Sequence, residues 1–412
     1  MERAFNVNGE EPGGAPVGKS ERRAYAKINL TLNVTGKRPD GYHEIETIMQ
    51  AVSLCDDVSV TVSAMSADCG DGASEGDCAA GDTGCEGGDG APPLREHIGA
   101  DTVNVIRLTL DTRDGYIASQ DIPADARNTA YGAAQEYLAA LAARAAQEGA
   151  ALPRFRVDIR INKRIPAGAG LAGGSADAAA TLLALNEIFN RYRPPVIAGH
   201  NACEETPNAR TDVVIASNEC CEAIHIPDAK LAAIALRVGA DVPFCMRGGT
   251  ALAAGVGELL TPLTGVMRNM PGYAVLLANP RREVSTRIVY ENYSLSRKWI
   301  ILYHSKMTRN MVKSIRKYIN GACEIGIARR AGHFARKTCF NVLEKTAVKI
   351  CPQISAYKKI MIKRGAVCAS MSGSGATVFA LFREPEKARA AAEELRKLGA
   401  WTALCGLQGE SK

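Results

Sequence analysis

The 412-residue chain has few aromatic residues and no long apolar run. Because aromatic residues make up 5% of the chain, any hydrophobic core must be built mainly from aliphatic side chains. No apolar stretch approaches the roughly 20 residues that a membrane helix requires. The first residues also lack the apolar centre of a signal peptide. We therefore expect a cytoplasmic protein with no membrane partner.

Cysteine is frequent, but its spacing is not that of common metal sites. The thirteen cysteines contain no C-x-x-C pair, and Cys69, Cys78 and Cys85 lie in a segment rich in glycine and acids. Because these spacings match no usual zinc pattern, free thiols are favoured over a metal site. The sequence assigns no metal ligand.

The net charge of +6 conceals a strong asymmetry along the chain. Residues 66–90 carry seven acids and no Lys or Arg, whereas residues 281–364 carry twenty basic side chains against four acids. Such a basic region is either a set of solvated helix faces or a field that attracts polyanions. The polyanion would be a nucleotide substrate or a nucleic acid, and charge alone does not decide between them.

Strand and helix patterns alternate along the chain, which predicts α+β or α/β layers. Residues 1–20 have the composition of a disordered tail, and residues 65–98 and 193–227 have that of irregular insertions. From about residue 266 the sequence changes to a basic pattern of alternating strands and helices. We therefore expect two domains, 21–265 and 266–412.

The expected elements follow from hydrophobic periodicity and from turn residues. Strands are expected at 23–36, 52–64, 155–161, 248–255, 256–263, 273–280 and 377–382. Helices are expected at 128–147, 175–190, 228–239, 307–319, 334–350 and 386–399.

The stretch PAGAGLAGGSADAAATLLALN, residues 166–186, resembles two nucleotide-binding motifs without completing either. It contains G-x-G-x-x-G, but residues 162–166 separate it from the preceding strand and no acid follows a second strand. It also resembles a Walker A loop, but Gly174 stands where the lysine is required. Close packing of small residues against a neighbouring helix is the structural alternative.

A more general phosphate-binding device is consistent with the same residues. Glycines let the backbone approach a ligand closely, and a helix N-terminus offers free N–H groups and the positive end of its dipole. Ser175, at the start of the helix, either caps it or bonds to phosphate.

Phosphoryl transfer also needs a group that handles the proton of the acceptor hydroxyl. Lys27 lies on the polar face of the strand 23–36, and Asp241 follows the helix 228–239. An aspartate can take a hydroxyl proton while a lysine offsets the developing charge. Each residue alone could equally be a surface charge or a turn residue.

Four blocks occur in the order of a known family. They are AYAKINLTLNVTGKRPDGYHEIETIMQ, the stretch 166–186, GADVPFCMRGGTALAAGVGELLTPL and SMSGSGATVFALF. Together they resemble the GHMP kinase superfamily of small-molecule kinases. A-K-I-N-L followed by R-P-D-G-Y-H resembles the 4-diphosphocytidyl-2-C-methyl-D-erythritol kinases within it.

This resemblance implies an α+β, two-domain GHMP kinase fold. It comprises an N-terminal α/β domain and a C-terminal α/β sandwich, with the active site in the cleft between them. It implies ATP, with Mg²⁺, as phosphoryl donor and a cytidyl diphosphate polyol as acceptor at its 2-hydroxyl, in non-mevalonate isoprenoid biosynthesis. Lys27 and Asp241 would be the catalytic pair. No nucleic-acid partner is implied, and the oligomeric state stays open.

The resemblance also implies roles for further residues. His43 would pair with the cytosine edge and Tyr290 would stack on the ring, worth roughly 1–3 kcal/mol. The implied substrate-binding residues are Asn29, Tyr42, His43, Thr286 and Tyr290. The implied ATP-binding residues are Asn128 and Lys163 near adenine, Pro166, Gly168, Gly170, Leu171, Gly173, Gly174 and Ser175 around the phosphates, and Gly373 and Gly375 closing over them.

Two departures and two alternatives accompany the resemblance. Glu283 stands where the family often has glycine, and Val342 where an aspartate is usual. A GHMP kinase for another small alcohol is one alternative. A nucleic-acid-binding protein that uses the basic region is the other.

Overall fold

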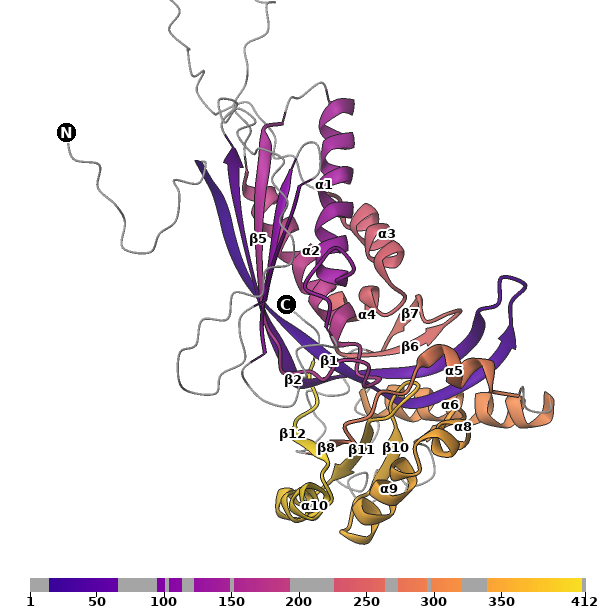
Figure 1. The fold of residues 1–412 in the computed structure, drawn as a ribbon. Coiled ribbons are helices and arrows are strands. Elements are labelled where there is room, and N and C mark those ends of the chain that lie inside the picture. Colours follow the sequence, from indigo (N-terminus) through magenta and orange to yellow (C-terminus); the bar gives the residue numbers. More distant parts are fainter. Residues whose placement is uncertain are drawn as a thin grey trace, which may run out of the picture.

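A computed structural model describes residues 15–65, 95–100, 104–112, 122–148, 152–192, 226–263, 273–294, 298–319 and 339–409 (Figure 1). In these ranges the chain forms sheets of eight and four strands, with helices packed against both. The predicted α+β class is confirmed. None of the helices in these ranges is long and apolar enough to cross a membrane.

Two strands of 23 residues, β1 (Ala15–Lys37) and β2 (His43–Met65), organise the larger sheet. They pair antiparallel from end to end. The strand predicted at 23–36 is confirmed as part of β1. The tail predicted over 1–20 is wrong for residues 15–20, which begin β1; there Ser20 donates a hydrogen bond to Glu187 at 2.7 Å. Residues 1–14 lie outside the described ranges.

The larger sheet has the strand order β3-β4-β5-β2-β1-β9, with β6 on β2 and β7 on β6. These strands are β3 (Arg95–Ala100), β4 (Val105–Asp111), β5 (Arg154–Asn162), β6 (Thr250–Ala254), β7 (Leu259–Pro262) and β9 (Phe340–Asn341). The insertion predicted over 65–98 is wrong at its ends, because Met65 ends β2 and residues 95–98 lie in β3. Residues 66–94 and 193–225 lie outside the described ranges.

Four helices, labelled in Figure 1, cover one face of this sheet. They are α1 (Thr129–Gln147), α2 (Gly173–Arg191), α3 (Asp228–Val238) and α4 (Val242–Arg247). Their buried alanines and leucines pack with valines and isoleucines of β2, β4 and β5 into one core. Aliphatic residues dominate this core, as the low aromatic content predicts.

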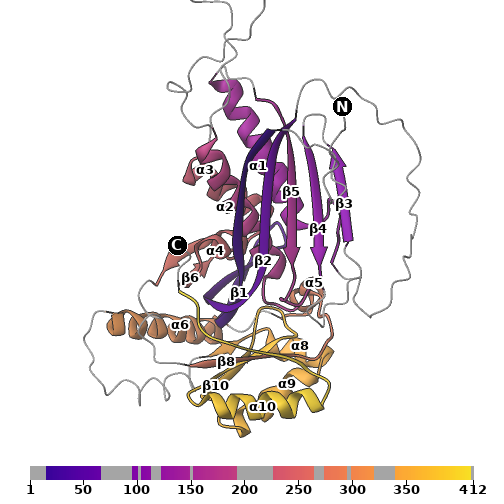
Figure 2. The same ribbon diagram turned by 90° about the vertical axis from the view of Figure 1, so that its left-hand side faces the viewer.

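The smaller sheet has the order β10-β11-β8-β12 and is antiparallel throughout. Its strands are β8 (Ala274–Asn279), β10 (Cys368–Met371), β11 (Val378–Phe382) and β12 (Trp401–Cys405). The accompanying helices are α5 (Thr286–Glu291), α6 (Lys298–Ile319), α8 (Glu344–Ile350), α9 (Gln353–Lys363) and α10 (Pro385–Lys397) (Figure 2). The helix predicted at 334–350 is wrong at residues 340–341, which pair with β1 as β9.

The two sheets share a continuous hydrophobic core. Ile28 and Leu30 of β1 pack in one cluster with Val275 and Leu277 of β8. Residues of the second half also join the first sheet, since Gln408 N–H donates to the Ala51 carbonyl at 2.8 Å. The domain boundary at residue 266 stays a prediction.

A buried ionic triad fixes the chain just before the 166–175 stretch. The Lys163 ammonium lies 2.5 Å from an Asp56 oxygen and 2.6 Å from an Asp177 oxygen. Asp56 also accepts the backbone N–H groups of Arg164 and Ile165. Burial raises the pKa of Asp177 well above its ordinary value. For Lys163, burial lowers the pKa, but the two carboxylates outweigh this effect, so the pKa of the ammonium is raised. The two carboxyl groups therefore share one ammonium as their counter-charge.

Lys163→Met should destabilise the protein by about 3–5 kcal/mol at neutral pH, because it leaves two adjacent buried carboxyl groups without a cation. The loss should shrink as the pH falls, since a carboxyl whose folded-state pKa is raised binds its proton more readily in the folded protein. Urea unfolding at several pH values measures both effects.

The neighbouring Arg164→Met removes the same charge from a pair with Asp57 whose side chains are 40% and 44% exposed. It should cost no more than about 1 kcal/mol. Equal costs for the two variants would show that the triad does not fix this segment.

Candidate active site

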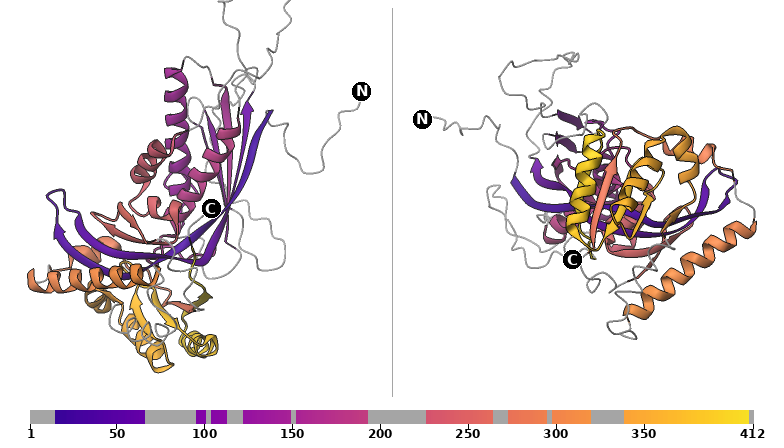
Figure 3. Two further views of the ribbon diagram at one scale, coloured as in Figure 1. Left: turned by 180° about the vertical axis from the view of Figure 1, so that it is seen from behind. Right: turned by 90° about the horizontal axis from the view of Figure 1, so that it is seen from below.

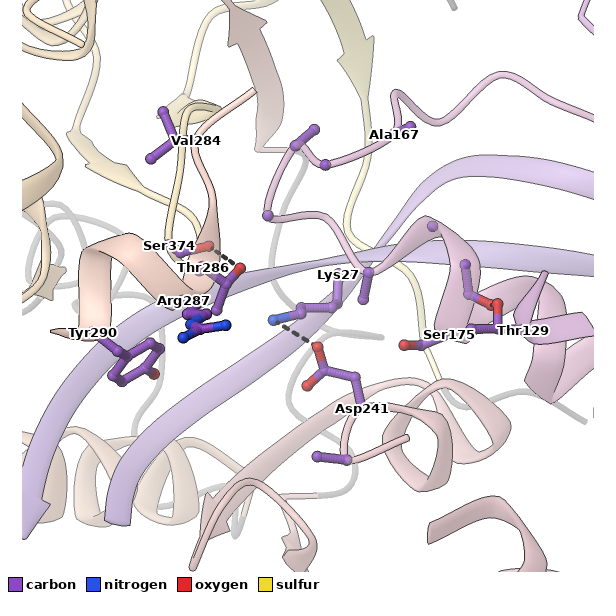
Figure 4. Close-up of a pocket in the computed structure, with 18 of the residues that line it drawn as sticks. Lys27, Thr129, Ala167, Ser175, Asp241, Val284, Thr286, Arg287, Tyr290 and Ser374 are labelled. Atoms are coloured by element: carbon purple, nitrogen blue, oxygen red, sulfur yellow. Dashed lines mark hydrogen bonds and ion pairs between the residues drawn. The ribbon is translucent and has the colours of Figure 1, made fainter. Parts of the chain in front are cut away.

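A cleft of about 1070 Å³ opens where the two sheets meet (Figure 4). Its walls come from β1, β2 and α5, from the glycine loop (residues 166–175) and from the serine loop (residues 372–375). This volume is at the upper end of small-molecule sites, so it can hold two substrates. Of the predicted site residues, those lining the cleft are Lys27, Asn29, Tyr42, His43, Asn128, Lys163, Pro166, Gly168, Gly170, Gly173, Gly174, Ser175, Asp241, Thr286, Tyr290 and Gly373.

Lys27 and Asp241 form an ion pair at the centre of this cleft. The Lys27 Nζ lies 3.3 Å from Asp241 Oδ2; the lysine side chain is 6% exposed and the aspartate side chain 30%. A buried ammonium requires a counter-charge, and Asp241 supplies it. The two residues come from β1 and from the turn that follows Gly239, which ends α3 as predicted. The aspartate is the more accessible member of the pair, and its carboxylate is directed at Lys27 in Figure 4.

Asn29 connects Lys27 to the serine loop and to β2 through hydrogen bonds. Its Oδ1 accepts the Lys27 ammonium at 3.0 Å and the Gly373 N–H at 3.0 Å, and its Nδ2 donates to Thr47 at 2.9 Å. The residue is 1% exposed. Asn29 thus orients Lys27 and the serine loop, and its predicted contact with substrate stays a prediction.

The glycine loop adopts backbone angles that explain its composition. Gly168 and Gly170 have φ of 59° and 75°, where a side chain is strained. The N-cap residue of α2 is Ala172, whose side chain makes no capping hydrogen bond. Ser175 lies inside the first turn of the helix and therefore does not cap it. The first turn of α2 therefore begins at Gly173 with N–H groups that have no partner inside the helix. These groups and the Ser175 hydroxyl, which points toward the cleft in Figure 4, form an anion-binding surface.

Close packing accounts for the remaining glycines of the loop. A Cβ at Gly174 would lie 2.9 Å from the Thr129 hydroxyl, and one at Gly173 would lie 3.0 Å from Ile165. Thr129 donates a hydrogen bond to the Gly174 carbonyl at 2.7 Å. The two explanations of this stretch thus apply to different residues: backbone conformation at its start, helix packing at its end.

The glycine loop and the serine loop cross in direct backbone contact. A Cβ at Gly170 would lie 2.3 Å from the Ser372 carbonyl oxygen. The Ser372 hydroxyl donates to the Gly170 carbonyl at 3.0 Å. Leu171 and Gly375 do not line the cleft: Leu171 is buried in the shared core, and its carbonyl accepts the Lys27 N–H at 3.0 Å.

The two residues expected near adenine have structural bonds. Asn128 caps α1, accepting the Ala130 N–H at 2.9 Å and donating to the Pro123 carbonyl at 2.8 Å. Lys163 is held by the two carboxylates of the triad. Both residues line the cleft near the glycine loop, but the sequence did not indicate these bonds. Their contacts with adenine stay predictions.

An aromatic pair marks the other end of the cleft. The rings of His43 and Tyr290 lie 5.1 Å apart at 33°, and the exposed Tyr42 is beside His43 in the chain. Burial, and to a smaller extent Lys37, lowers the pKa of His43. Burial raises the pKa of Tyr290, which stays a neutral phenol. The Thr286 hydroxyl bonds to Ser374 at 2.7 Å and so links α5 to the serine loop.

Two cleft residues had no role in the sequence analysis. A Cβ at Gly168 would lie 2.7 Å from Glu283 Cγ, so this glutamate of the second half packs on the glycine loop. Arg287 points into the cleft and donates to Glu291 at 2.7 Å (Figure 4). Its position directly after Thr286 was the available signal. Glu283 was visible only as a departure from the family pattern.

The described residues contain no cluster of three His, Cys, Asp or Glu side chains that could hold a metal ion. The cleft does offer the Ser175 hydroxyl and the Asp241 carboxylate, which are hard oxygen donors. Mg²⁺ often binds through substrate phosphates and one or two protein oxygens. The donors therefore fit a cation that arrives with a nucleotide. The insertion cysteines lie outside the described ranges.

Both halves of the chain match family models. Residues 128–202 match the GHMP kinases N terminal domain, and residues 315–400 match the model described as GHMP kinases C terminal. A solved homoserine kinase from Cytophaga hutchinsonii shares the fold, with a TM-score of 0.54 and 16% identity over 99% of this chain and 98% of that one.

Sequence relatives narrow the family. The 4-diphosphocytidyl-2-C-methyl-D-erythritol kinase of Caldicellulosiruptor bescii is 33% identical over 374 residues, 91% of this chain and 93% of that protein. The protein of that name from Clostridium novyi is 29% identical over 89% of this chain and 92% of its own length. A crystal structure of 4-(cytidine 5'-diphospho)-2C-methyl-D-erythritol kinase has a TM-score of 0.52 at 27% identity, over 94% of this chain and 99% of that one.

The similarity to these relatives extends over nearly the whole of both chains and includes both lobes around the cleft. On this evidence the chain is a small-molecule kinase and belongs to the 4-diphosphocytidyl-2-C-methyl-D-erythritol kinase family of GHMP kinases.

Proposed function

We propose that the protein transfers the γ-phosphoryl group of ATP to the 2-hydroxyl of 4-diphosphocytidyl-2-C-methyl-D-erythritol, a step of non-mevalonate isoprenoid precursor biosynthesis in the cytoplasm. The observation that carries the proposal is the Lys27–Asp241 pair, placed in one cleft with the glycine loop and the His43–Tyr290 rings. The names of the relatives support the same acceptor.

Asp241 is the base in this proposal. Its carboxylate takes the proton of the substrate 2-hydroxyl while the oxygen forms a bond to the γ-phosphorus. The bond from that phosphorus to the β–γ bridging oxygen breaks, and ADP leaves with the electron pair. Lys27, held by Asn29, lies within 3.3 Å of the carboxylate and offsets negative charge on the attacking oxygen. Positioning and electrostatics supply most of the catalysis in such transfers.

The glycine loop holds the ATP phosphates. The N–H groups at the start of α2 and the Ser175 hydroxyl donate to phosphate oxygens. A Mg²⁺ ion that arrived with the nucleotide would supply charge neutralisation at the phosphates. The Ser175 and Asp241 oxygens are the side chains of this chain that would contact it.

The aromatic end of the cleft recognises the cytosine ring. Tyr290 stacks on the base, and neutral His43 can both donate and accept a hydrogen bond at its edge. An acceptor alcohol that carries no nucleobase would leave the His43 and Tyr290 rings without a contact. That consideration favours the cytidyl substrate over another small alcohol.

Asp241→Asn should lower kcat by about 10²–10⁴-fold, the usual contribution of a positioned general base. ATP affinity should stay within about twofold, since the glycine loop is unchanged. ADP release with ATP, Mg²⁺ and 4-diphosphocytidyl-2-C-methyl-D-erythritol measures the rate, and calorimetry measures ATP binding.

Asp40→Asn is the matched control, because Asp40 lines the same cleft but pairs with the exposed Arg38. It should keep near-normal kcat. Near-normal turnover by the Asp241 variant would remove Asp241 from the mechanism. Absence of turnover in the unmodified protein, with ATP still bound, would instead exclude the proposed acceptor.

Tyr290→Ala should raise KM for the cytidyl substrate by about 5–150-fold, the equivalent of 1–3 kcal/mol of base stacking. KM for ATP should not change, because the glycine loop lies at the other end of the cleft. Tyr290→Phe keeps the ring and should behave like the unmodified enzyme. An increase confined to the KM for ATP would show that cytosine binds elsewhere.

The pH dependence of substrate binding should report His43. Because its pKa is lowered, the imidazole is neutral above about pH 6.5, and KM for the cytidyl substrate should be flat from about pH 8 to 6.5. KM should rise only at more acidic pH, as the ring gains its proton. His43→Gln should have a higher KM without this acid rise. An acid rise retained in the variant would assign the titration to another group.

A further inference from the structure

The helix α6 carries a surface that the kinase reaction does not use. It spans 22 residues with six Lys or Arg side chains and no acid. Figure 3 shows it lying along the outside of the molecule, apart from the helices that cover the two sheets. None of residues 298–313, the part of α6 whose side chains the structure describes, lines the cleft. It contributes six of the twenty basic side chains of residues 281–364.

One face of α6 is fixed on the larger sheet. Asn33 of β1 donates to the Ile301 carbonyl at 3.2 Å and to the Ser305 hydroxyl at 3.1 Å. Thr308, Met311 and Val312 are buried on the same side. This spacing of three and four residues is that of one helix face. The opposite face is therefore held in a fixed orientation toward solvent.

The outward face combines an apolar end with a cationic stripe. Trp299, Leu302 and Tyr303 are 65%, 55% and 58% exposed and lie together at the start of the helix. The exposed cations of the following turns continue this face. We define the α6 outer face as Trp299, Leu302, Tyr303, Lys306, Arg309 and Lys313.

The chemistry of the α6 outer face selects its partner. Two copies of this chain meeting there would bring like charges together, which disfavours a symmetric dimer. Single-stranded nucleic acid is typically bound in a positively charged groove lined with aromatic rings, whereas the α6 outer face is one side of a single helix on the outside of the molecule (Figure 3). Exposed Trp, Tyr and Leu beside Lys and Arg fit a bilayer interface with anionic headgroups.

We propose that the α6 outer face docks the protein on an anionic lipid bilayer. The apolar end enters the interface between headgroups and acyl chains, and the cations contact lipid phosphates. This association is peripheral, so it is compatible with a chain whose described helices cannot span a membrane. The lack of a spanning segment, from which we expected no membrane partner, does not bear on a peripheral contact of this kind. Cytoplasmic leaflets carry the negative charge that such a face requires.

Flotation of the full-length protein with vesicles tests the proposal. The protein should bind vesicles of equal parts phosphatidylcholine and phosphatidylglycerol, and should not bind phosphatidylcholine alone. Added salt should weaken binding, because exposed charges are screened. Lys306→Gln, Arg309→Gln and Lys313→Gln together should weaken it about a hundredfold, at roughly fivefold for each cation. Trp299→Ser with Leu302→Ser should weaken it about tenfold or more.

Matched controls carry the same changes elsewhere on the surface. Lys359→Gln, Lys363→Gln and Lys397→Gln remove three exposed charges from α9 and α10, and Leu259→Ser with Ile362→Ser removes two exposed apolar side chains. Both controls should bind anionic vesicles like the unmodified protein. Kinase turnover should be unchanged in all four variants, which shows that they are folded and keeps this test separate from the proposed function.

A spectroscopic readout reports the apolar end directly. The chain has two tryptophans, so Trp401→Phe leaves Trp299 as the sole indole. Its emission should shift to the blue with anionic vesicles and stay unchanged with neutral ones. Three results would overturn the proposal: equal binding to both vesicle types, α6 variants that bind like their controls, or loss of a dimer or of RNA binding in those variants without loss of vesicle binding.

Discussion

The cleft depends on one steric constraint, the backbone contact between two loops from opposite halves of the chain. A Cβ at Gly170 would lie 2.3 Å from the Ser372 carbonyl oxygen, and one at Gly373 would lie 3.0 Å from the Gly170 carbonyl oxygen. Only glycine permits this approach. The Gly373 N–H then reaches Asn29, which also accepts the Lys27 ammonium. The position of the Lys27–Asp241 pair, to which we assign the reaction, is thus coupled to the packing of the two halves against each other.

Two buried lysines near this contact differ in the number and exposure of their acidic partners. Lys163 lies between Asp56 and Asp177, both almost fully buried. Both carboxylates are engaged with its ammonium, and these ion pairs stabilise the segment that leads into the glycine loop. Lys27 has one carboxylate partner, Asp241, whose side chain is 30% exposed. A partly exposed carboxylate beside a buried cation can exchange a proton with a bound hydroxyl. The accessibility of the acid, more than the burial of the lysine, is thus our reason for proposing Lys27–Asp241 and not the Lys163 triad as the reacting group.

The features that the sequence revealed are those encoded within a few consecutive residues. The alternation at 23–36, the glycines around residue 170 and the Gly239 stop each act locally, and the alternating Val105–Asp111 could have been predicted in the same way. Contacts between distant segments leave no such pattern. Residues 340–341 pair with β1, and Glu283 packs on Gly168, only because the two halves fold together. Hydrophobic periodicity indicates the secondary structure of one segment but not which distant segment packs against it.

The basic side chains of the cleft and those of the α6 outer face differ in how many have acidic partners. Of the cations that line the cleft, Lys27, Arg127, Lys163 and Arg287 each have an acidic partner at 3.3 Å or closer, and Lys37 has no ion pair among the described residues. In the proposed function, a polyanion at the glycine loop is therefore bound chiefly by backbone N–H groups and a helix terminus, whose geometry is fixed by the fold. The cations of the α6 outer face have no such partner among the described residues, so their field extends into solvent until salt screens it. The excess basic charge thus acts at the surface, at longer range than the chemistry in the cleft.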